Sequence, residues 1–267
     1  MIRINDKKID MKHFPDGTML IKYLADNEST KITWLYDNDE EYMGIFFLVK
    51  HLRTHGVKKI ELFMPYIPNA RMDRVKNSDE VFTLKYFAEF INDFKFDSVE
   101  VLDPHSNVST ALIDNISIIE PTDIILNLLE TMNSDGNTIL FFPDEGAMKR
   151  YSHIASKCDI PYVFGMKNRD WRSGEILELE VLGETDAVPG KNILIIDDIC
   201  SRGGTFLHSA KALKAMGAAD IDLYVSHLEN SVWEGDMIRS RLVRNIYTTN
   251  SIYRFQNKGP VKVVKEY

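Results

Sequence analysis

The stretch ILIIDDICSRGGTF, residues 193–206, decides the fold of this chain. It opens with four consecutive apolar residues, which predict a strand buried in the middle of a sheet. Two adjacent carboxylates, Asp197 and Asp198, follow this run. A loop containing Gly203 and Gly204 comes next, and Thr205 is the predicted cap of the following helix. Because open α/β sheets bind ligands outside the carboxyl ends of their strands, this loop is the first candidate for a binding site.

The residues of this loop suit a ribose phosphate. Adjacent carboxylates at a strand end can accept hydrogen bonds from ribose hydroxyls, and amides around Gly203, Gly204 and Thr205 can surround a phosphate at a helix N-terminus. We include Ser201 and Arg202 in this expected ribose-phosphate site. As bare spacing, the pattern can also be a structural turn in which Thr205 caps the following helix, so other segments have to decide.

Apolar runs alternate with amphipathic stretches along the whole chain. Strands are predicted at residues 59–64, 98–102, 138–142, 162–164, 193–196 and 221–225. Helices are predicted at residues 41–55, 81–94, 121–132, 146–156 and 205–216. Crossover helices between strands imply parallel pairing with helices on both sheet faces, and the length suits two tandem α/β units. We expect an N-terminal domain at residues 1–119 and a C-terminal domain at residues 120–267.

Composition excludes several classes of protein. The 267 residues include 32 Lys and Arg against 40 Asp and Glu, and the net charge of -8 disfavours a nucleic-acid partner. Apolar runs are far shorter than the roughly 20 residues of a membrane span, and the start MIRINDKKID has no apolar targeting core. We therefore expect a cytoplasmic protein without a membrane partner. Cys158 and Cys200 are too few for a disulfide framework and are expected to be free thiols.

Polar residues with catalytic or ligand-binding chemistry follow the predicted strands, where ligands of α/β sheets bind. In chain order these residues are Arg71, Asp73, Asp103, His105, Asp144, Lys167 and Arg169. Each has a structural alternative: Arg71 can be a surface charge, Asp103 a strand-end cap, and a single histidine such as His105 is more often structural than functional. Their common placement after strands favours the functional interpretation.

The loop at residues 193–206 resembles the ribose-phosphate-binding motif shared by phosphoribosyltransferases and ribose-phosphate pyrophosphokinases. Two segments favour the pyrophosphokinases. MPYIPNARMDR, residues 64–74, resembles their ATP-binding segment, and LDPHSNVSTALID, residues 102–114, resembles their strand-loop with a metal-associated histidine. HFPDGTMLIK, residues 13–22, resembles the hairpin by which one subunit reaches the ATP site of its neighbour.

Two later segments continue the resemblance. FPDEGAMKR, residues 142–150, resembles the motif after the first strand of the family's second domain. MKNRD, residues 166–170, resembles its mobile catalytic segment, in which a lysine and an arginine two residues apart hold the transferring phosphates. The match keeps the family's order from about His13 to Ile252.

The resemblance implies two tandem phosphoribosyltransferase-like domains, the first binding ATP and the second binding a ribose phosphate. It also implies transfer of a diphosphoryl group from magnesium-bound ATP to the anomeric hydroxyl of the ribose compound, with AMP as the leaving group. Such chemistry depends on positioning and charge stabilisation, so cations are needed rather than a nucleophile. Lys167 and Arg169 are the expected catalytic residues.

The resemblance also assigns binding roles. The expected ATP-binding residues are Phe14, Asp16, Arg71, Asp73 and His105. Phe14 and Asp16 would reach the nucleotide of a neighbouring subunit, which implies a homo-oligomer, at least a dimer. The expected magnesium-associated residues are His105 and Asp144. The expected ribose-phosphate residues are Asp144, Asp197, Asp198, Ser201, Arg202, Gly203, Gly204 and Thr205.

The chain departs from the family pattern in the phosphate loop, where Ser201 and Arg202 replace an acid and a threonine. An arginine can fork across two phosphate oxygens, which favours an acceptor with a diphosphate, and ADP-ribose is the natural candidate. Short phage relatives that diphosphorylate ADP-ribose for NAD resynthesis fit this pattern, and ribose 5-phosphate is the alternative acceptor. Met72 and Thr18 stand where glutamine and glutamate are usual, so nucleotide contacts are expected to differ.

The chain is also shorter than the family at both ends, so hexamer formation and allosteric control are not expected. Two other functions compete with diphosphate transfer. A phosphoribosyltransferase would need the sugar-phosphate loop but not Arg71, His105 or the pair Lys167 and Arg169. A regulator without catalysis would have lost the catalytic cations, which this chain keeps.

Overall fold

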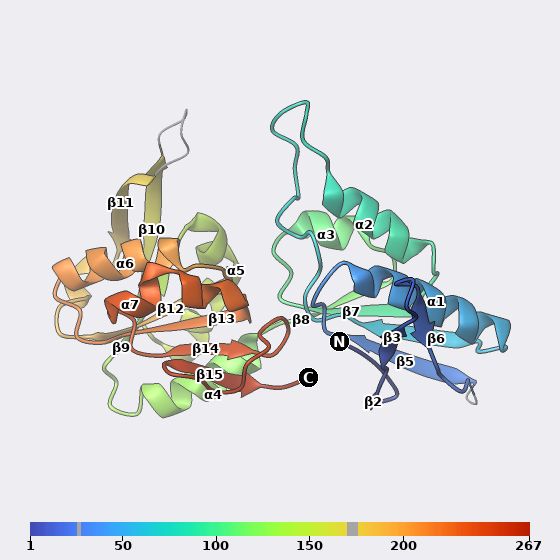
Figure 1. The fold of residues 1–267 in the computed structure, drawn as a ribbon. Helices are drawn as coiled ribbons and strands as arrows, with labels where there is room; N and C mark the ends of the chain where they lie inside the picture. Colours follow the sequence, from blue (N-terminus) through green and yellow to red (C-terminus); the bar gives the residue numbers. More distant parts are fainter. Residues whose placement is uncertain (26–27, 170–175) are drawn as a thin grey trace. The chain divides into compact units, whose positions relative to one another are not determined.

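The computed structural model describes residues 1–25, 28–169 and 176–267, and for residues 167–169 and 176–179 the backbone alone. The chain divides into two compact units, Met1–Glu120 and Pro121–Tyr267 (Figure 1). Each unit has a mainly parallel sheet flanked by helices, which confirms the predicted α/β fold class. None of the helices in the described ranges has the length and apolar content needed to span a bilayer.

The first unit contains a six-stranded sheet in the order β2-β1-β5-β6-β7-β8. Strands β5 to β8 are parallel, whereas β1 and β2 run antiparallel to their neighbours. The strands are β1 (Ile2–Ile4), β2 (Lys7–Lys8), β5 (Ser29–Trp34), β6 (Lys59–Phe63), β7 (Ser98–Leu102) and β8 (Ile116–Ile119). The helices are α1 (Glu40–Thr54), α2 (Thr83–Asn92) and α3 (Asn107–Leu112). A separate hairpin pairs β3 (Met11–His13) with β4 (Met19–Ile21).

The two faces of this first sheet differ in polarity. Ile32 and Trp34 of β5 are fully buried in the core that α1 and α2 cover. Lys31, directly before Ile32, points to the opposite face, where it is exposed and donates a hydrogen bond of 2.7 Å to Glu100 of β7. Helices were predicted on both faces of the sheet, whereas this face carries an exposed ion pair. Lys31 also interrupts the apolar run of β5, which explains why this strand was not predicted from the sequence.

The second unit contains a seven-stranded sheet in the order β11-β10-β9-β12-β13-β14-β15. Among the strand pairs of its described residues, β10–β11 is antiparallel and the others are parallel. The strands are β9 (Thr138–Phe142), β10 (Tyr162–Arg169), β11 (Ile176–Gly183), β12 (Asn192–Cys200), β13 (Ile221–Leu228), β14 (Ile246–Thr249) and β15 (Val261–Lys265). The helices are α4 (Thr122–Met132), α5 (Glu145–Cys158), α6 (Gly204–Ala215) and α7 (Asp236–Ser240), with 3-10 turns η1 (Thr185–Ala187) and η2 (Asn230–Glu234).

Strand β12 is the centre of the second unit. Ile193 and Ile195 pack into the core that α6 covers, whereas Leu194 and Ile196 pack into the core that α4 and α5 cover. All four side chains are completely buried. Successive side chains of a strand point to opposite faces, so a continuous apolar run fills both cores. Full burial of each such side chain stabilises the unit by roughly 1.5–3 kcal/mol, and the predicted buried strand is confirmed.

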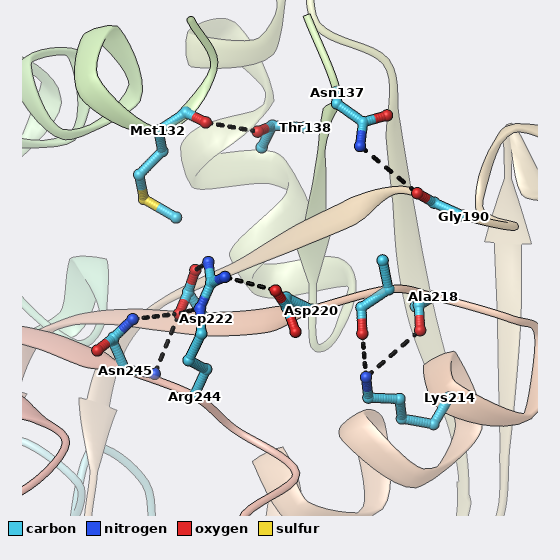
Figure 2. Close-up of polar contacts among 11 residues, drawn as sticks. Met132, Asn137, Thr138, Gly190, Lys214, Ala218, Asp220, Asp222, Arg244 and Asn245 are labelled. Atoms are coloured by element: carbon cyan, nitrogen blue, oxygen red, sulfur yellow. Dashed lines mark hydrogen bonds and ion pairs between the residues drawn. The ribbon is translucent and has the colours of Figure 1, made fainter. Parts of the chain in front are cut away.

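A polar network ties the start of β13 to the start of β14 (Figure 2). Asp222 is completely buried and accepts hydrogen bonds from Arg244 Nε at 3.2 Å and Nη2 at 2.5 Å. The Asn245 backbone amide and side-chain Nδ2 donate to the same carboxylate at 3.0 and 2.9 Å. Arg244 Nη1 also donates to Asp220 at 2.5 Å. The buried charge is thus paired and fully hydrogen-bonded, which offsets its loss of hydration.

We expect Asp222→Ala to lower the free energy of unfolding by about 3 kcal/mol, because Arg244 and Asn245 would lose a shared buried acceptor. Chemical denaturation followed by circular dichroism measures this loss. Asp236→Ala is the control, since Asp236 is 78% exposed and pairs with Arg239 at 3.4 Å on the surface. The control should change stability by less than about 0.5 kcal/mol. Equal effects of the two substitutions would rule out a special contribution of the buried network.

Candidate functional site

The two adjacent acids lie on strand β12 itself. The sequence predicted that this strand ends at Ile196, but its pairing with β13 continues from Asp197, opposite Val225, to Cys200. The predicted end was therefore wrong, because the neighbouring strand supplies hydrogen bonds beyond the apolar run. The Asp198 side chain is 2% exposed and the Asp197 side chain 14% exposed. Both carboxylates are thus held by a rigid strand rather than by a loop.

Arg150 of helix α5 binds both carboxylates. Its Nη2 atom donates to Asp198 Oδ1 at 2.6 Å and lies 3.4 Å from Asp197 Oδ1. The guanidinium also lies over the ring of Tyr151, 5.1 Å from the centroid. Arg150 was not predicted from the sequence, where its one signal is its place six residues after Asp144 in the segment that resembles a family motif. One shared cation keeps two neighbouring acids together at the end of the sheet.

Asp144 adds a third carboxylate to this cluster. It follows β9 and caps α5, where its Oδ1 atom accepts a hydrogen bond of 3.0 Å from the Ala147 amide. Burial, and next the negative charges of Asp198 and Asp144, raise the pKa of Asp197 well above its ordinary value, whereas Arg150 opposes the rise. The three carboxylates, of which Asp197 and Asp198 bind the single guanidinium of Arg150, leave excess negative charge. Such a cluster suits donors such as ribose hydroxyls or a further cation.

The phosphate loop enters helix α6 through Gly203. This residue has φ +79°, a left-handed conformation that favours glycine, and it occupies the N-cap position before Gly204. The prediction of Thr205 as the N-cap was therefore wrong, and Thr205 lies within the first turn of α6. A Cβ atom on Gly203 would lie 2.8 Å from Met237 of α7. The unpaired amides of the first turn can bind an anion at this helix end.

Arg202 and the segment after β13 meet at this loop. Arg202 Nη2 donates to Glu234 of η2 at 2.9 Å, and both side chains are mostly exposed. Gly235, the next residue, approaches the backbone so closely that a Cβ atom there would lie 1.9 Å from the Arg202 carbonyl oxygen. Ser201 is half-buried beside them. The sequence did not single out Glu234 or Gly235, since neither stands in a recognisable motif.

Lys167 and Arg169 lie on strand β10, which continues to Arg169 instead of ending at Phe164 as predicted. The extension pairs with β11, with Lys167 opposite Leu179, and Figure 1 shows the two strands projecting together from the sheet. The side chains of Lys167 and Arg169 lie outside the described part of the chain. Their role in catalysis therefore stays a prediction.

The predicted ATP-binding residues all lie in the first unit. Arg71 and Asp73 follow β6 and His105 follows β7, a parallel neighbour, so the two loops leave the same edge of the sheet. Arg71 is exposed, whereas His105 is half-buried. Asn69, with φ +62°, donates from Nδ2 to the hydroxyl of Tyr42 on α1 at 3.0 Å and so anchors the segment.

The β3–β4 hairpin presents Phe14 and Asp16 at its turn. Phe14 is 50% exposed. Asp16 accepts hydrogen bonds from the Thr18 hydroxyl at 2.7 Å and the Thr18 amide at 3.0 Å, and these bonds lower the pKa of the Asp16 carboxyl. Thr18, where the family has glutamate, thus stabilises the turn from within. An exposed aromatic ring on a fixed turn is suited to contact a second molecule.

The predicted magnesium residues belong to different units, His105 to the first and Asp144 to the second. Within the described residues, no three His, Cys, Asp or Glu side chains are arranged as a metal site. Mg²⁺ in phosphoryl-transfer enzymes is commonly held by one or two carboxylates together with substrate phosphates and water. The magnesium assignment therefore stays a prediction.

Comparison with known protein families identifies the class. A family model described as the phosphoribosyl transferase domain matches residues 112–250, which include the acids on β12, the phosphate loop and Arg150. The chain therefore belongs to the phosphoribosyl transferase domain family.

Within that class, its relatives are pyrophosphokinases. The ribose-phosphate pyrophosphokinase of Saccharolobus solfataricus is 26% identical over 250 residues, 92% of this chain and 84% of the relative. That of Thermococcus kodakarensis is 27% identical over 249 residues, 92% of this chain and 86% of the relative. The crystal structure of phosphoribosylpyrophosphate synthetase from Mycobacterium smegmatis has the same fold, with a TM-score of 0.77, 18% identity and coverage of 97% and 86%. The predicted resemblance is confirmed, and this chain is a diphosphotransferase of the ribose-phosphate pyrophosphokinase kind.

We expect Asp197→Asn to raise the free energy of unfolding by about 1 kcal/mol near neutral pH, because it removes one of the crowded charges while Asp198 still binds Arg150. The pKa of Asp197 in the native state lies above its ordinary value of 3.8. The native protein therefore pays an ionisation penalty that is full above the raised pKa, begins to fall as the pH drops through it, and disappears near the ordinary value of 3.8.

The gain from Asp197→Asn should thus shrink as the pH is lowered. Denaturant titrations at several pH values measure the effect, and Asp186→Asn at an exposed site serves as the control. A gain that is constant with pH would show that charge crowding is not its cause.

Proposed function

We propose that this enzyme transfers the β,γ-diphosphoryl group of magnesium-bound ATP to the anomeric hydroxyl of a 5-phosphorylated ribose and releases AMP. The second unit binds the acceptor, and the first unit binds ATP. The observation that carries the acceptor site is the arrangement of Asp197 and Asp198 on β12, both bound by Arg150, directly before a loop at a helix N-terminus. Carboxylates there can bind ribose hydroxyls while the loop amides bind the 5-phosphate.

The transfer forms a bond between the anomeric oxygen and the β-phosphorus. The bond from that phosphorus to the oxygen bridging the α-phosphorus breaks, AMP leaves with that oxygen, and the hydroxyl proton is released. Negative charge increases around the β-phosphorus, so the cations Lys167 and Arg169 stabilise the transition state. Magnesium supplies further charge neutralisation when it is bound. Asp144 belongs to the anionic cluster and is the residue of the second unit that would hold it.

ATP binding is assigned to Arg71, Asp73 and His105 of one subunit, with Phe14 and Asp16 supplied by another. The half-exposed ring of Phe14 on a turn fixed by Asp16 supports this role. Since one subunit would complete the nucleotide site of its neighbour, the active enzyme is a homo-oligomer, at least a dimer.

We favour ADP-ribose as the acceptor, giving ADP-ribose pyrophosphate for NAD resynthesis. Arg202 supports this choice, because its guanidinium lies at the phosphate loop and, among the described side chains, forms an ion pair with a surface carboxylate, Glu234. An exposed ion pair of this kind contributes little stability, so a second phosphate can compete for the arginine. Ribose 5-phosphate is the second candidate, and the names of the pyrophosphokinase relatives favour it.

The acceptor is tested by measuring AMP release from magnesium-ATP with ADP-ribose and ribose 5-phosphate supplied separately, with mass analysis of the products. We expect Arg202→Thr to shift the ratio of kcat/KM values towards ribose 5-phosphate by about tenfold, because it removes a charge-assisted bond to the second phosphate. Arg239→Thr, at an exposed site on α7, is the control. An unchanged ratio would refute the diphosphate role of Arg202. AMP release from ATP without any nucleobase would exclude a phosphoribosyltransferase.

We expect Lys167→Ala to lower kcat by at least about a hundredfold with little change in thermal stability, because it removes a cation needed in the transition state. Rapid-quench measurement of AMP formation gives kcat, and circular dichroism verifies folding. Lys157→Ala, an exposed lysine in the last turn of α5, should leave kcat unchanged. Near-normal turnover in folded Lys167→Ala would exclude this lysine from the mechanism.

A further inference from the structure

A group of aromatic and cationic side chains beside the phosphate loop has no role in the reaction described so far. It is formed by η2, which follows β13, and by residues 250–258, which follow β14. Strands β12, β13 and β14 are parallel neighbours in the sheet, so the phosphate loop, η2 and residues 250–258 leave the same edge. The Arg254 amide donates to Asn230 Oδ1 at 3.1 Å and joins the two later segments.

Lys258 lies between two aromatic rings of this group. Its ammonium is 4.6 Å from the ring centroid of Trp233 and 4.5 Å from that of Phe255. Phe255 is 43% exposed, and Trp233 is half-buried. Within the described residues, no carboxylate forms an ion pair with Lys258. The two rings therefore border a common space near the surface, which the Lys258 ammonium occupies. A single planar group can bind beside the ammonium or replace it there.

Two buried polar atoms lie under this space. The Trp233 indole NH and the Tyr253 hydroxyl are both buried, and neither meets hydrogen-bond geometry with a partner in the described structure. Burial raises the pKa of the Tyr253 hydroxyl, and an imperfect hydrogen bond with the Trp233 indole opposes part of that rise, so the two groups are each other's nearest partners. The indole NH can only donate, so the Tyr253 hydroxyl proton still lacks an acceptor in the described structure, and water or a ligand can supply one.

This aromatic group is connected to the diphosphate candidate Arg202 through η2. Trp233 is followed directly by Glu234, which binds Arg202 at 2.9 Å, and then by Gly235 against the Arg202 carbonyl. A molecule whose 5-phosphate occupies the loop and whose second phosphate reaches Arg202 would continue over η2. The cations along that path are Arg202 and Lys258, the carboxylate is Glu234, which pairs with Arg202, and the aromatic ring of Trp233 follows.

We propose that Phe255, Trp233 and Lys258 form a subsite for the far nucleoside of a dinucleotide-like acceptor, whose base stacks on the aromatic rings while Lys258 moves to its diphosphate. The proposal rests on the assigned acceptor site and extends it to the adenosine half of the substrate. Stacking of a base on an aromatic ring is tolerant of base identity and needs one accessible ring face, which Phe255 offers. Ribose 5-phosphate has no base and would not reach these residues.

The test measures equilibrium binding of ADP-ribose and ribose 5-phosphate by calorimetry without ATP, together with KM values for both acceptors. We expect Phe255→Ala and Lys258→Ala each to weaken ADP-ribose binding by about tenfold and to leave ribose 5-phosphate within about twofold. Phe255→Tyr keeps a stacking ring and should restore binding. The controls are Phe47→Ala, another exposed phenylalanine, and Lys262→Ala, an exposed lysine on β15.

The outcomes separate the subsite from the acceptor assignment. If AMP forms only with ribose 5-phosphate, but ADP-ribose binds in a Phe255-dependent way, the subsite stands and the preferred acceptor is wrong. If ADP-ribose is turned over and neither variant affects its binding or KM, the subsite is wrong and the acceptor assignment stands. Equal losses for both acceptors, or no binding of ADP-ribose to the unmodified enzyme, would also overturn the subsite.

Discussion

The contact of Arg150 with two neighbouring carboxylates is the interaction on which the acceptor site depends. Asp197 and Asp198 are adjacent on a strand whose backbone is held by pairing with β13, so the two acids cannot move apart. Both side chains are largely removed from water. Without a cation, their mutual repulsion and desolvation would favour protonation of one of them, and with it the loss of an acceptor. Helix α5 supplies that cation, and Asp144 caps the same helix. The position of α5 therefore limits the rise in the pKa of Asp197.

Register within the sheet determines what surrounds this charged centre. Because β12 pairs with β13 as far as Cys200, the chain leaves the sheet directly at the phosphate loop. The Cys200 carbonyl then accepts the Glu229 amide at 2.8 Å, which fixes the start of the segment leading into η2. Gly235 closes the contact against the Arg202 carbonyl. Two segments far apart in sequence thus form one continuous edge around the loop.

The sequence predicted those parts of the fold and site in which local chemistry and tertiary environment agree. The run of Ile193 to Ile196 is apolar because both its faces are buried, so it was readily recognised as a strand. Strand β5 was missed because Lys31 lies on a charged sheet face and breaks the apolar run. The strand end at Ile196 was misplaced because hydrogen bonds from β13, which sequence periodicity does not show, continue the strand through two acids.

Residues that act through tertiary contacts were also missed. Arg150 is one arginine among many on amphipathic helices, and only the fold brings it to Asp198. Glu234 and Gly235 stand in no motif, and their proximity to Arg202 depends on the path of the chain after β13. The N-cap of α6 was assigned to Thr205 by residue type, whereas the N-cap is Gly203, two residues earlier, where the backbone is left-handed. Residue type shows which side chains are able to cap a helix, but the backbone conformation decides which residue is the N-cap.

The buried network of Asp222, Arg244 and Asn245 lies at the amino ends of β13 and β14, the edge of the sheet opposite to the acids and the phosphate loop. Structural reinforcement and ligand chemistry are thus placed at separate edges of one sheet. Crowded like charges and a helix end with unsatisfied amides each disfavour folding. Stability contributed by the network at one edge of the sheet allows the other edge to keep both features. The loops at the acceptor edge can therefore diverge during evolution, and a substrate preference can change, while the scaffold of the domain is inherited intact.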